Sequence, residues 1–251
     1  MSHKEIQTRK VQIGLLMAFK KVKLLKAQRN DFKRNKFFKV LILAAHYDDD
    51  IIGCGGTIAF HCINGDSCDV IFMTDSSGLH NSDYDKKRLS IIRKQESYNA
   101  LRQIGFINII CWEQPDGYLT PNKRLSELLA KYITKNNYDI IYFPNLQDSY
   151  NDHKAVGKIL LEAMKKVQNN PCLLMYEILE PLKSPNMYRD ISKVMNIKLN
   201  AMKQHKTQLD YIDYIRIIEY INKIRGKQIG SKYCEAFYCL NTNELKKILI
   251  D

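Results

Sequence analysis

The chain has 251 residues, of which 45% are hydrophobic and 26% are charged, values that are ordinary for one globular domain with a substantial core. No apolar run approaches the roughly eighteen residues that a membrane-spanning helix needs, so none is expected. The seven cysteines are odd in number and include no Cys-x-x-Cys pair. This pattern argues against a disulfide framework and predicts reduced thiols in a cytoplasmic protein.

The formal net charge of +12 is concentrated at the amino terminus. Residues 1–37 hold eleven Lys or Arg against two acidic residues, which leaves only +3 for the rest of the chain. Apolar side chains recur on one face of this segment at helical spacing: Val11, Leu15, Ala18, Val22 and Leu25. We therefore predict a basic amphipathic N-terminal helix over 1–37, followed by a catalytic domain over 38–251.

Two interpretations of this helix stay open. It packs on its own domain or on a second subunit of a homo-oligomer, or it lies on an anionic membrane surface. The second would make the protein peripheral at the inner membrane surface. No nucleic acid partner is expected, because a basic segment without an aromatic stacking platform is weak evidence for one.

Apolar runs typical of buried strands alternate with helical stretches along the rest of the chain. The expected strands are 40–45, 68–74, 108–111, 139–143 and 172–177, and the expected helices are 55–64, 86–104, 122–136, 153–169, 190–204 and 207–224. This alternation predicts a Rossmann-like three-layer α/β fold, with a mostly parallel sheet and helices on both faces. Ligands of such sheets bind beyond the carboxyl ends of the strands.

The first expected strand ends in a dense group of ionisable side chains: His46, Asp48, Asp49 and Asp50. Such a group costs stability through like-charge repulsion unless a cation lies there. A divalent metal is the obvious candidate, with His46 and Asp49 as ligands and Asp48 free as a base. The alternative is an Asp-rich loop that only caps the next helix.

A second strand end carries a histidine beside an aspartate. Asp152 and His153 follow the apolar run 140–144. A lone His153 at a helix start would more often have no ligand role. Together with His46 and Asp49, however, it completes the two-histidine, one-carboxylate set that binds zinc or ferrous iron with open positions for water and substrate.

In these motifs the chain resembles the LmbE-like, or PIG-L-like, metal-dependent de-N-acetylases, and the resemblance runs in order over residues 38–240. The family's (A/P)HPDDE motif with its GCGGT turn corresponds to 45–50 and 53–57, and its HPDHRAVG motif to 150–157. Weaker matches lie between and after them: Thr74-Asp75, Arg93-x-x-Glu96, Pro115-Asp116-Gly117, His205–Gln208 and Tyr233–Phe237.

The chain departs from the family at three positions. Tyr47 replaces a proline, Asp50 is one methylene shorter than the family's glutamate, and Tyr150 replaces the first histidine of HPDH. In the family that histidine is thought to stabilise the oxyanion or to protonate the leaving amine. A tyrosine hydroxyl can donate to an oxyanion, but its pKa of about 10 makes it a poorer proton donor near neutral pH.

The resemblance implies a zinc-dependent hydrolase that removes the acetyl group from an N-acetylated amino sugar carried on a larger conjugate. The expected metal is Zn²⁺ or another divalent ion such as Fe²⁺, held by His46, Asp49 and His153. Asp48 would take a proton from the activated water, and Tyr150 would donate to the oxyanion. The remaining expected site residues are Arg93 for substrate binding, with a helix salt bridge to Glu96 as its alternative, and Asp50, Asp152 and His205 as supporting groups.

Two other interpretations compete with this one. Gly53–Gly56 and Asp75 form a partial dinucleotide-binding fingerprint, but Ile58 stands at its third glycine and three acids precede the turn where a pyrophosphate would lie. The changes at Tyr47, Asp50 and Tyr150 also fit a catalytically impaired sugar-binding member of the same fold. No residue pattern indicates which acetylated sugar is bound.

Overall fold

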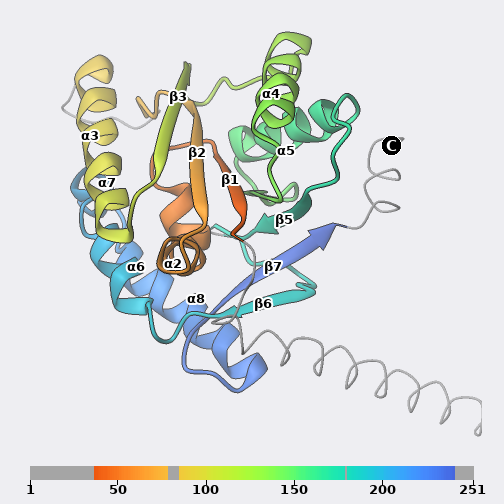
Figure 1. Cartoon of the computed structure of the whole chain (residues 1–251). Helices are drawn as coiled ribbons and strands as arrows, with labels where there is room; N and C mark the ends of the chain where they lie inside the picture. The colour runs from red at the N-terminus through yellow and green to blue at the C-terminus, as the bar shows by residue number, and fades with distance from the viewer. Residues whose placement is uncertain (1–36, 79–84, 179, 241–251) are drawn as a thin grey trace, which may run out of the picture. The chain divides into compact units, whose positions relative to one another are not determined.

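The computed structural model describes residues 37–78, 85–178 and 180–240, so the predicted helix over 1–37 lies outside the described residues except for its last position. The described chain forms one seven-stranded sheet covered by helices (Figure 1). Its strands are β1 (Lys39–Ala44), β2 (Ser67–Thr74), β3 (Asn108–Gln114), β4 (Ile140–Pro144), β5 (Cys172–Tyr176), β6 (Met187–Asp190) and β7 (Cys234–Leu240).

The strand order is β3-β2-β1-β4-β5-β7-β6. The first five strands in this order are parallel to one another, whereas β7 pairs antiparallel with both β5 and β6. The chain leaves β1 toward β2 on one side and later returns to β4 on the other. The carboxyl ends of β1 and β4 therefore form the topological switch point, where doubly wound sheets bind their ligands.

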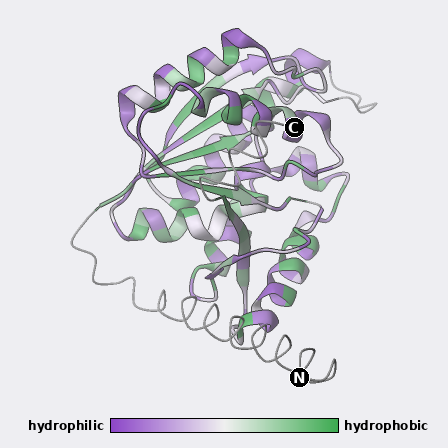
Figure 2. Cartoon of the chain, turned by 90° about the vertical axis from the view of Figure 1, so that its right-hand side faces the viewer, coloured by the Kyte–Doolittle hydropathy of each residue, from purple (hydrophilic) through white to green (hydrophobic). Residues whose placement is uncertain are grey.

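Both faces of the sheet are buried, which explains the unbroken apolar runs in the parallel strands. Along β1, Val40, Ile42 and Ala44 belong to one hydrophobic cluster, and Leu41 and Leu43 belong to a second on the opposite face. The first cluster lies under α2 (Asp49–Ile63), α3 (Lys86–Ile104), α6 (Met195–Met202) and α8 (Tyr214–Ile229), and the second under α4 (Lys123–Asn136) and α5 (Asn151–Met164). Figure 2 shows hydrophobic colour along the strands and mixed colour on the covering helices. The predicted three-layer fold is confirmed.

Helix α2 carries the acidic group at its start and bends at Cys54, where φ is −143° and ψ is 20°. Beyond the bend, the Glu235 carboxylate from β7 accepts hydrogen bonds from the backbone of Gly56 (2.9 Å) and from the backbone and hydroxyl of Thr57 (2.7 and 2.6 Å). Lys198 of α6 balances this charge at 2.7 Å, and both side chains are fully buried. Glu235 thus caps the second half of α2 from a distant strand.

The glycines of the GCGGT turn provide room for this close packing. A Cβ on Gly53 would lie 2.2 Å from the Tyr176 ring, and one on Gly56 would lie 2.8 Å from Ile191. Neither contact is with the flexible end of a long side chain, so a larger residue at either position would displace α2 from its packed position. The glycines therefore serve helix–sheet packing.

The expected elements differ from the structure mainly in the last third of the chain. The helix expected over 190–204 begins only at Met195, because Asp190 still belongs to β6. The helix expected over 207–224 is two helices, α7 (Lys206–Leu209) and α8, since the Asp213 side chain accepts from the Arg216 backbone and starts a new helix there. No helix of the described residues is long and apolar enough to cross a bilayer.

Candidate functional site

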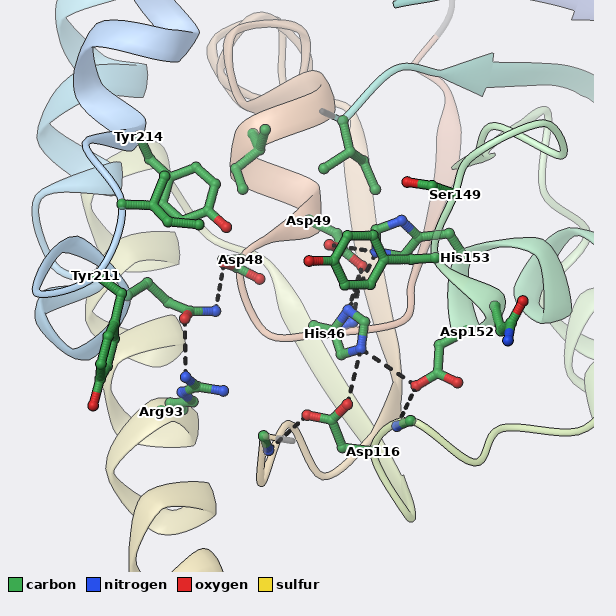
Figure 3. A pocket seen from close by; sticks show the side chains of 18 residues that line it. His46, Asp48, Asp49, Arg93, Asp116, Ser149, Asp152, His153, Tyr211 and Tyr214 are labelled. Carbon is green, nitrogen blue, oxygen red and sulfur yellow. Dashed lines mark hydrogen bonds and ion pairs between the residues drawn. The ribbon is translucent and has the colours of Figure 1, made fainter. Parts of the chain in front are cut away.

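A cavity of about 370 Å³ opens at the switch point (Figure 3). One wall comes from the ends of β1 and β4, and it carries His46, Asp49, Asp152 and His153. The opposite wall comes from α3, α7 and the start of α8, and includes Arg93, Gln208, Tyr211 and Tyr214. The motif residues that the sequence places 107 positions apart, His46 and His153, thus meet in one cavity.

Potential ligand atoms of three residues converge in this cavity. His46 Nδ1 lies 3.2 Å from His153 Nε2 and 3.5 Å from Asp49 Oδ2. His153 Nε2 lies 3.2 Å from Asp49 Oδ1. Asp49 is itself held in place, because its Oδ2 accepts hydrogen bonds from the backbone of Ala45 (2.9 Å) and His46 (2.8 Å).

The outer nitrogens of both imidazoles face carboxylates. His46 Nε2 lies 3.2 Å from Asp116 Oδ1 and 3.4 Å from Asp152 Oδ2, and His153 Nδ1 lies 3.0 Å from Asp148 Oδ1. A proton on each outer nitrogen leaves the two inner nitrogens as bare lone pairs that point toward each other and toward Asp49. This donor set fits a divalent cation of the zinc type, for which a carboxylate commonly orients the ligating histidine. A second group, His46, Asp116 and Asp152, also has ligand atoms within 4.8 Å of one another. Asp152, however, already accepts from two backbone N–H groups.

The charges of the site follow from these contacts. Burial by itself lowers the pKa of an imidazole, but Asp49 and the outer carboxylates outweigh it, raising the pKa of His153 to about 9 and that of His46 well above its usual value. Against the effect of burial, His153 and His46 hold the pKa of Asp49 well below its usual range. These shifts are what a buried site of alternating charge produces.

Asp48 has different surroundings from Asp49. Its Oδ2 accepts a hydrogen bond of 2.8 Å from Gln208 Nε2, and the Gln208 carbonyl accepts one of 2.9 Å from Arg93. Burial and the charge of Asp49 raise the pKa of Asp48 to about 6. A carboxyl group with this pKa is suited to take and return a proton near neutral pH.

Asp152 and Asp116 connect His46 to a neighbouring loop. Asp152 accepts from the backbone of Gly117 (2.7 Å) and Leu119 (3.1 Å), and Asp116 accepts from the backbone of Gly78 (2.7 Å). The Pro115-Asp116-Gly117 loop is therefore fixed against α5, and it presents Asp116 to His46.

The other predicted site residues have mixed positions. Tyr150 lines the cavity with 46% of its surface exposed, and its ring lies 5.3 Å from that of His153. Asp50 is fully buried outside the cavity lining, and neither of its carboxyl oxygens makes a hydrogen bond to a described residue. His205 is also buried outside the lining, at the start of α7.

Arg93 lies in the cavity wall and does not form the helix salt bridge considered as its alternative. Its guanidinium donates to Ser76 O (2.9 Å) and to Gln208, whereas Glu96 accepts from Thr207 of α7. Tyr47 contributes indirectly: its backbone N–H donates to Ser76 Oγ at 2.9 Å, a bond that a proline at this position could not make.

Sequence reasoning missed several residues of the site. Asp116 and Gln208 belong to two of the weaker family motifs, which did not by themselves predict a function for either side chain. Asp148 was also not predicted, although it lies only two positions before Tyr150. Asp148 also accepts from the Tyr150 backbone at 3.0 Å. A carboxylate near a strand end was a usable signal for Asp148, whereas no local pattern marks Tyr211 or Tyr214.

Comparisons with known proteins agree with this geometry. The family model described as PIG-L, GlcNAc-PI de-N-acetylase, matches residues 41–164, which include every inner ligand atom. The diacetylchitobiose deacetylase of Thermococcus kodakarensis is 26% identical over 233 residues, covering 82% of this chain and 86% of that protein. The probable N-acetyl-alpha-D-glucosaminyl L-malate deacetylase 2 of Bacillus subtilis is 24% identical over 187 residues, covering 68% and 83%.

Among solved structures, the N,N'-diacetylchitobiose deacetylase of Pyrococcus horikoshii has the same fold, with a TM-score of 0.74. The two share 24% identity, and the match covers 89% of this chain and 92% of that one. The family match, the curated relatives and the shared fold all agree with the motifs at the switch point. In its motifs, its sequence and its fold, the chain resembles the LmbE-like, PIG-L-like deacetylases.

Proposed function

We propose that this protein is a metal-dependent hydrolase that removes the acetyl group from an N-acetylated amino sugar, an N-acetylglucosamine-type unit on a larger conjugate. The observation that carries the proposal is the convergence of His46, Asp49 and His153 beside Asp48 in one cavity. The names of the two curated relatives, a diacetylchitobiose deacetylase and a probable N-acetyl-alpha-D-glucosaminyl L-malate deacetylase, support an acetylated amino sugar as the substrate.

His46, Asp49 and His153 would hold the ion, Zn²⁺ or another divalent metal such as Fe²⁺. When bound, such an ion polarises the amide carbonyl and lowers the pKa of water from about 15.7 to about 7. Asp116, Asp152 and Asp148 keep the two imidazoles in the orientation and tautomer that binding requires.

Asp48 carries the proton through the reaction. As the water oxygen attacks the carbonyl carbon, Asp48 takes a proton from that water, and it returns the proton to the amine nitrogen as the C–N bond breaks. Tyr150 stands in the cavity wall beside His153, where its hydroxyl donates to the negative charge that develops on the carbonyl oxygen. Arg93 contributes a buried positive charge on the opposite wall and contacts the polar part of the substrate.

The test is acetate release from a panel of N-acetylated amino sugars, free and conjugated, by protein supplied with Zn²⁺ or Fe²⁺. Release that depends on added metal and on Asp48 supports the proposal. A protein that binds these sugars without releasing acetate would favour the second candidate, an impaired sugar-binding member of the family. The replacement of the family's histidine by Tyr150 is the observation that favours this second candidate.

We infer a separate role for the basic segment 1–37 from its charge and its apolar stripe alone. It acts outside the catalytic domain 38–251, either at an anionic membrane surface or in a homo-oligomer. Each basic residue near such a surface contributes about 1 kcal/mol, and salt weakens the attraction. Full-length protein should co-sediment with anionic vesicles at low salt and not at high salt. If the protein does not co-sediment with the vesicles at low salt, the segment packs on its own domain or on a second subunit.

A further inference from the structure

Part of the cavity wall opposite His153 comes from one short segment, residues 207–214, which lies beyond the matched family region (Figure 3). Its position is set by Glu96 of α3. The buried Glu96 carboxylate accepts from the Thr207 backbone at 3.0 Å and from the Thr207 hydroxyl at 2.6 Å. The next residue, Gln208, is thereby directed into the cavity.

Gln208 joins two charged groups that do not touch each other in the structure. Its Nε2 donates to Asp48 Oδ2 at 2.8 Å, and its Oε1 accepts from Arg93 Nη2 at 2.9 Å. The second Arg93 terminal nitrogen donates to Ser76 O at 2.9 Å. A guanidinium has only donors, so the Gln208 oxygen must face Arg93 and its NH₂ group must face Asp48. The orientation of the amide is therefore determined by its neighbours.

This fixed orientation distinguishes the two oxygens of Asp48. Oδ2 receives an N–H and must remain an acceptor. Oδ1 accepts no hydrogen bond from the described residues and belongs to a side chain in the cavity wall. A proton carried by Asp48 is consequently stable on Oδ1 and excluded from Oδ2.

The amide also separates Asp48 from Arg93. Hydrogen bonds between a guanidinium and a carboxylate are about twice as strong as neutral ones and are often bidentate. Without the amide between them, the Arg93 side chain could approach Asp48 and occupy both of its oxygens.

We propose that Gln208 is a positioning residue for Asp48: it confines the transferred proton to Oδ1 and prevents Arg93 from pairing directly with the base. The inference rests on the proposed function, in which Asp48 moves the proton. It gives Gln208 a part in turnover that goes beyond packing.

The first test is kinetic. Gln208→Glu keeps the size of the side chain and the contact with Arg93 but cannot donate to an ionised Asp48, and Gln208→Met keeps the size and removes both contacts. Both should lower kcat at least about tenfold, which is part of the roughly 10²- to 10⁴-fold that a general acid–base group contributes. KM should change less than kcat, and the metal content and the melting temperature should match the wild type. Gln204→Glu is the matched control, since the Gln204 side chain hydrogen-bonds, among the described residues, only to Asn200 O on α6, and this variant should keep full kcat.

A double variant separates positioning from substrate contact. In Gln208→Ala, Arg93 is free to capture Asp48, so Arg93→Met added to Gln208→Ala should raise kcat above that of Gln208→Ala alone. A residue that merely contacted substrate would give no such recovery. The inference is overturned if Gln208→Glu has the wild-type kcat. It is also overturned if kcat, metal content and melting temperature all fall together in Gln208→Glu, Gln208→Met and Gln208→Ala.

A crystal structure of Gln208→Ala tests the separation without any activity. We expect the Arg93 guanidinium within about 4 Å of the Asp48 carboxylate, the usual ion-pair distance. Arg93 still on Ser76 and away from Asp48 would contradict the separating role. Absence of acetate release by the wild type would instead count against the proposed function, and the crystallographic result would still decide this question.

Discussion

Asp48 and Asp49 are neighbours in the sequence and are almost equally buried, yet their different contacts shift their pKa values in opposite directions. Asp49 accepts from two backbone N–H groups and faces two imidazoles, and against the effect of burial the imidazoles hold its pKa well below the usual range. Asp48 faces a neutral amide, and burial raises its pKa to about 6. Titratable neighbours whose environments push their pKa values apart are a common sign of divided acid–base roles. One carboxylate is thus suited to hold a cation and the other to move a proton.

Replacing Asp48 by asparagine tests this division. Asp48→Asn should keep the bound metal but lower the rate of acetate release by a factor on the order of 100 or more, because the general base is lost. Tyr150→Phe, assayed alongside, should affect kcat more than KM if its hydroxyl donates to the oxyanion. Full turnover by Asp48→Asn would remove Asp48 from the mechanism.

The carboxylates that contact the outer nitrogens of His46 and His153 should affect how tightly a divalent metal binds. His153→Ala should abolish binding of one divalent ion per chain, and Asp148→Ala should weaken it about 10- to 100-fold, because the orienting partner of His153 is lost. Elemental analysis and metal titration measure both effects. Asp85→Ala, at the exposed start of α3, is the control and should bind metal normally. Equal metal in His153→Ala and the wild type would refute the ligand assignment.

His205 should affect stability in acid. Burial, with help from Arg93, lowers its pKa to about 3, so the unfolded chain binds a proton below pH 6.5 that the folded chain does not. The stability of the fold is therefore complete above pH 6.5 and is lost as the pH falls toward 3, by up to about 1.4 kcal/mol per pH unit. Urea unfolding of His205→Gln between pH 7 and pH 4 should show a flatter decline than that of the wild type. Parallel declines would mean that His205 is not buried in its neutral form.

At the scale of elements, α2 depends on a residue of β7. Its first turn carries Asp49 and Asp50, and its second half begins where Glu235 caps Gly56 and Thr57. Without this cap the bend at Cys54 would lose its support. The acidic group at the start of α2 would then no longer be held against the ends of β1 and β4.

Glu235→Gln should therefore destabilise the protein strongly. It leaves the fully buried Lys198 ammonium without its counter-charge, a change that typically costs about 3–5 kcal/mol. Adding Lys198→Met should recover part of this loss, because the unpaired charge is then removed as well. Denaturant unfolding of the metal-free variants measures both values. A loss below about 1 kcal/mol in the single variant would show that the pair is dispensable.

For the molecule as a whole, the parallel half of the fold was predictable because buried strands have unbroken apolar runs. All five expected strands are present, with ends shifted by a few residues. Two strands, β6 and β7, were not expected, and the four half-buried residues of the short edge strand β6 show no apolar pattern. The segment over 207–224 has continuous helical periodicity, and only the cap at Asp213 breaks it.

The site was predictable as far as strand ends and motifs could indicate it. His46, Asp48, Asp49 and His153 each stand in a local cluster whose chemistry is recognisable. The contact of Gln208 with Asp48 spans 160 residues, and that of Asp116 with His46 arises from the way two loops pack. Such partners depend on tertiary structure, and local sequence patterns do not report it.

The cap on α2 also has a consequence for how the protein matures in the cell. Glu235 is joined to Gly56 across 179 residues, and β7 is inserted between β5 and β6. During synthesis, His46, Asp49 and His153 leave the ribosome long before the strand that completes their support. In a nascent chain without β7, these three side chains would therefore not be held in fixed positions. The proposed metal would then bind only after β7 has emerged, so a chain truncated before β7 should be a protein without metal rather than a weakly active enzyme.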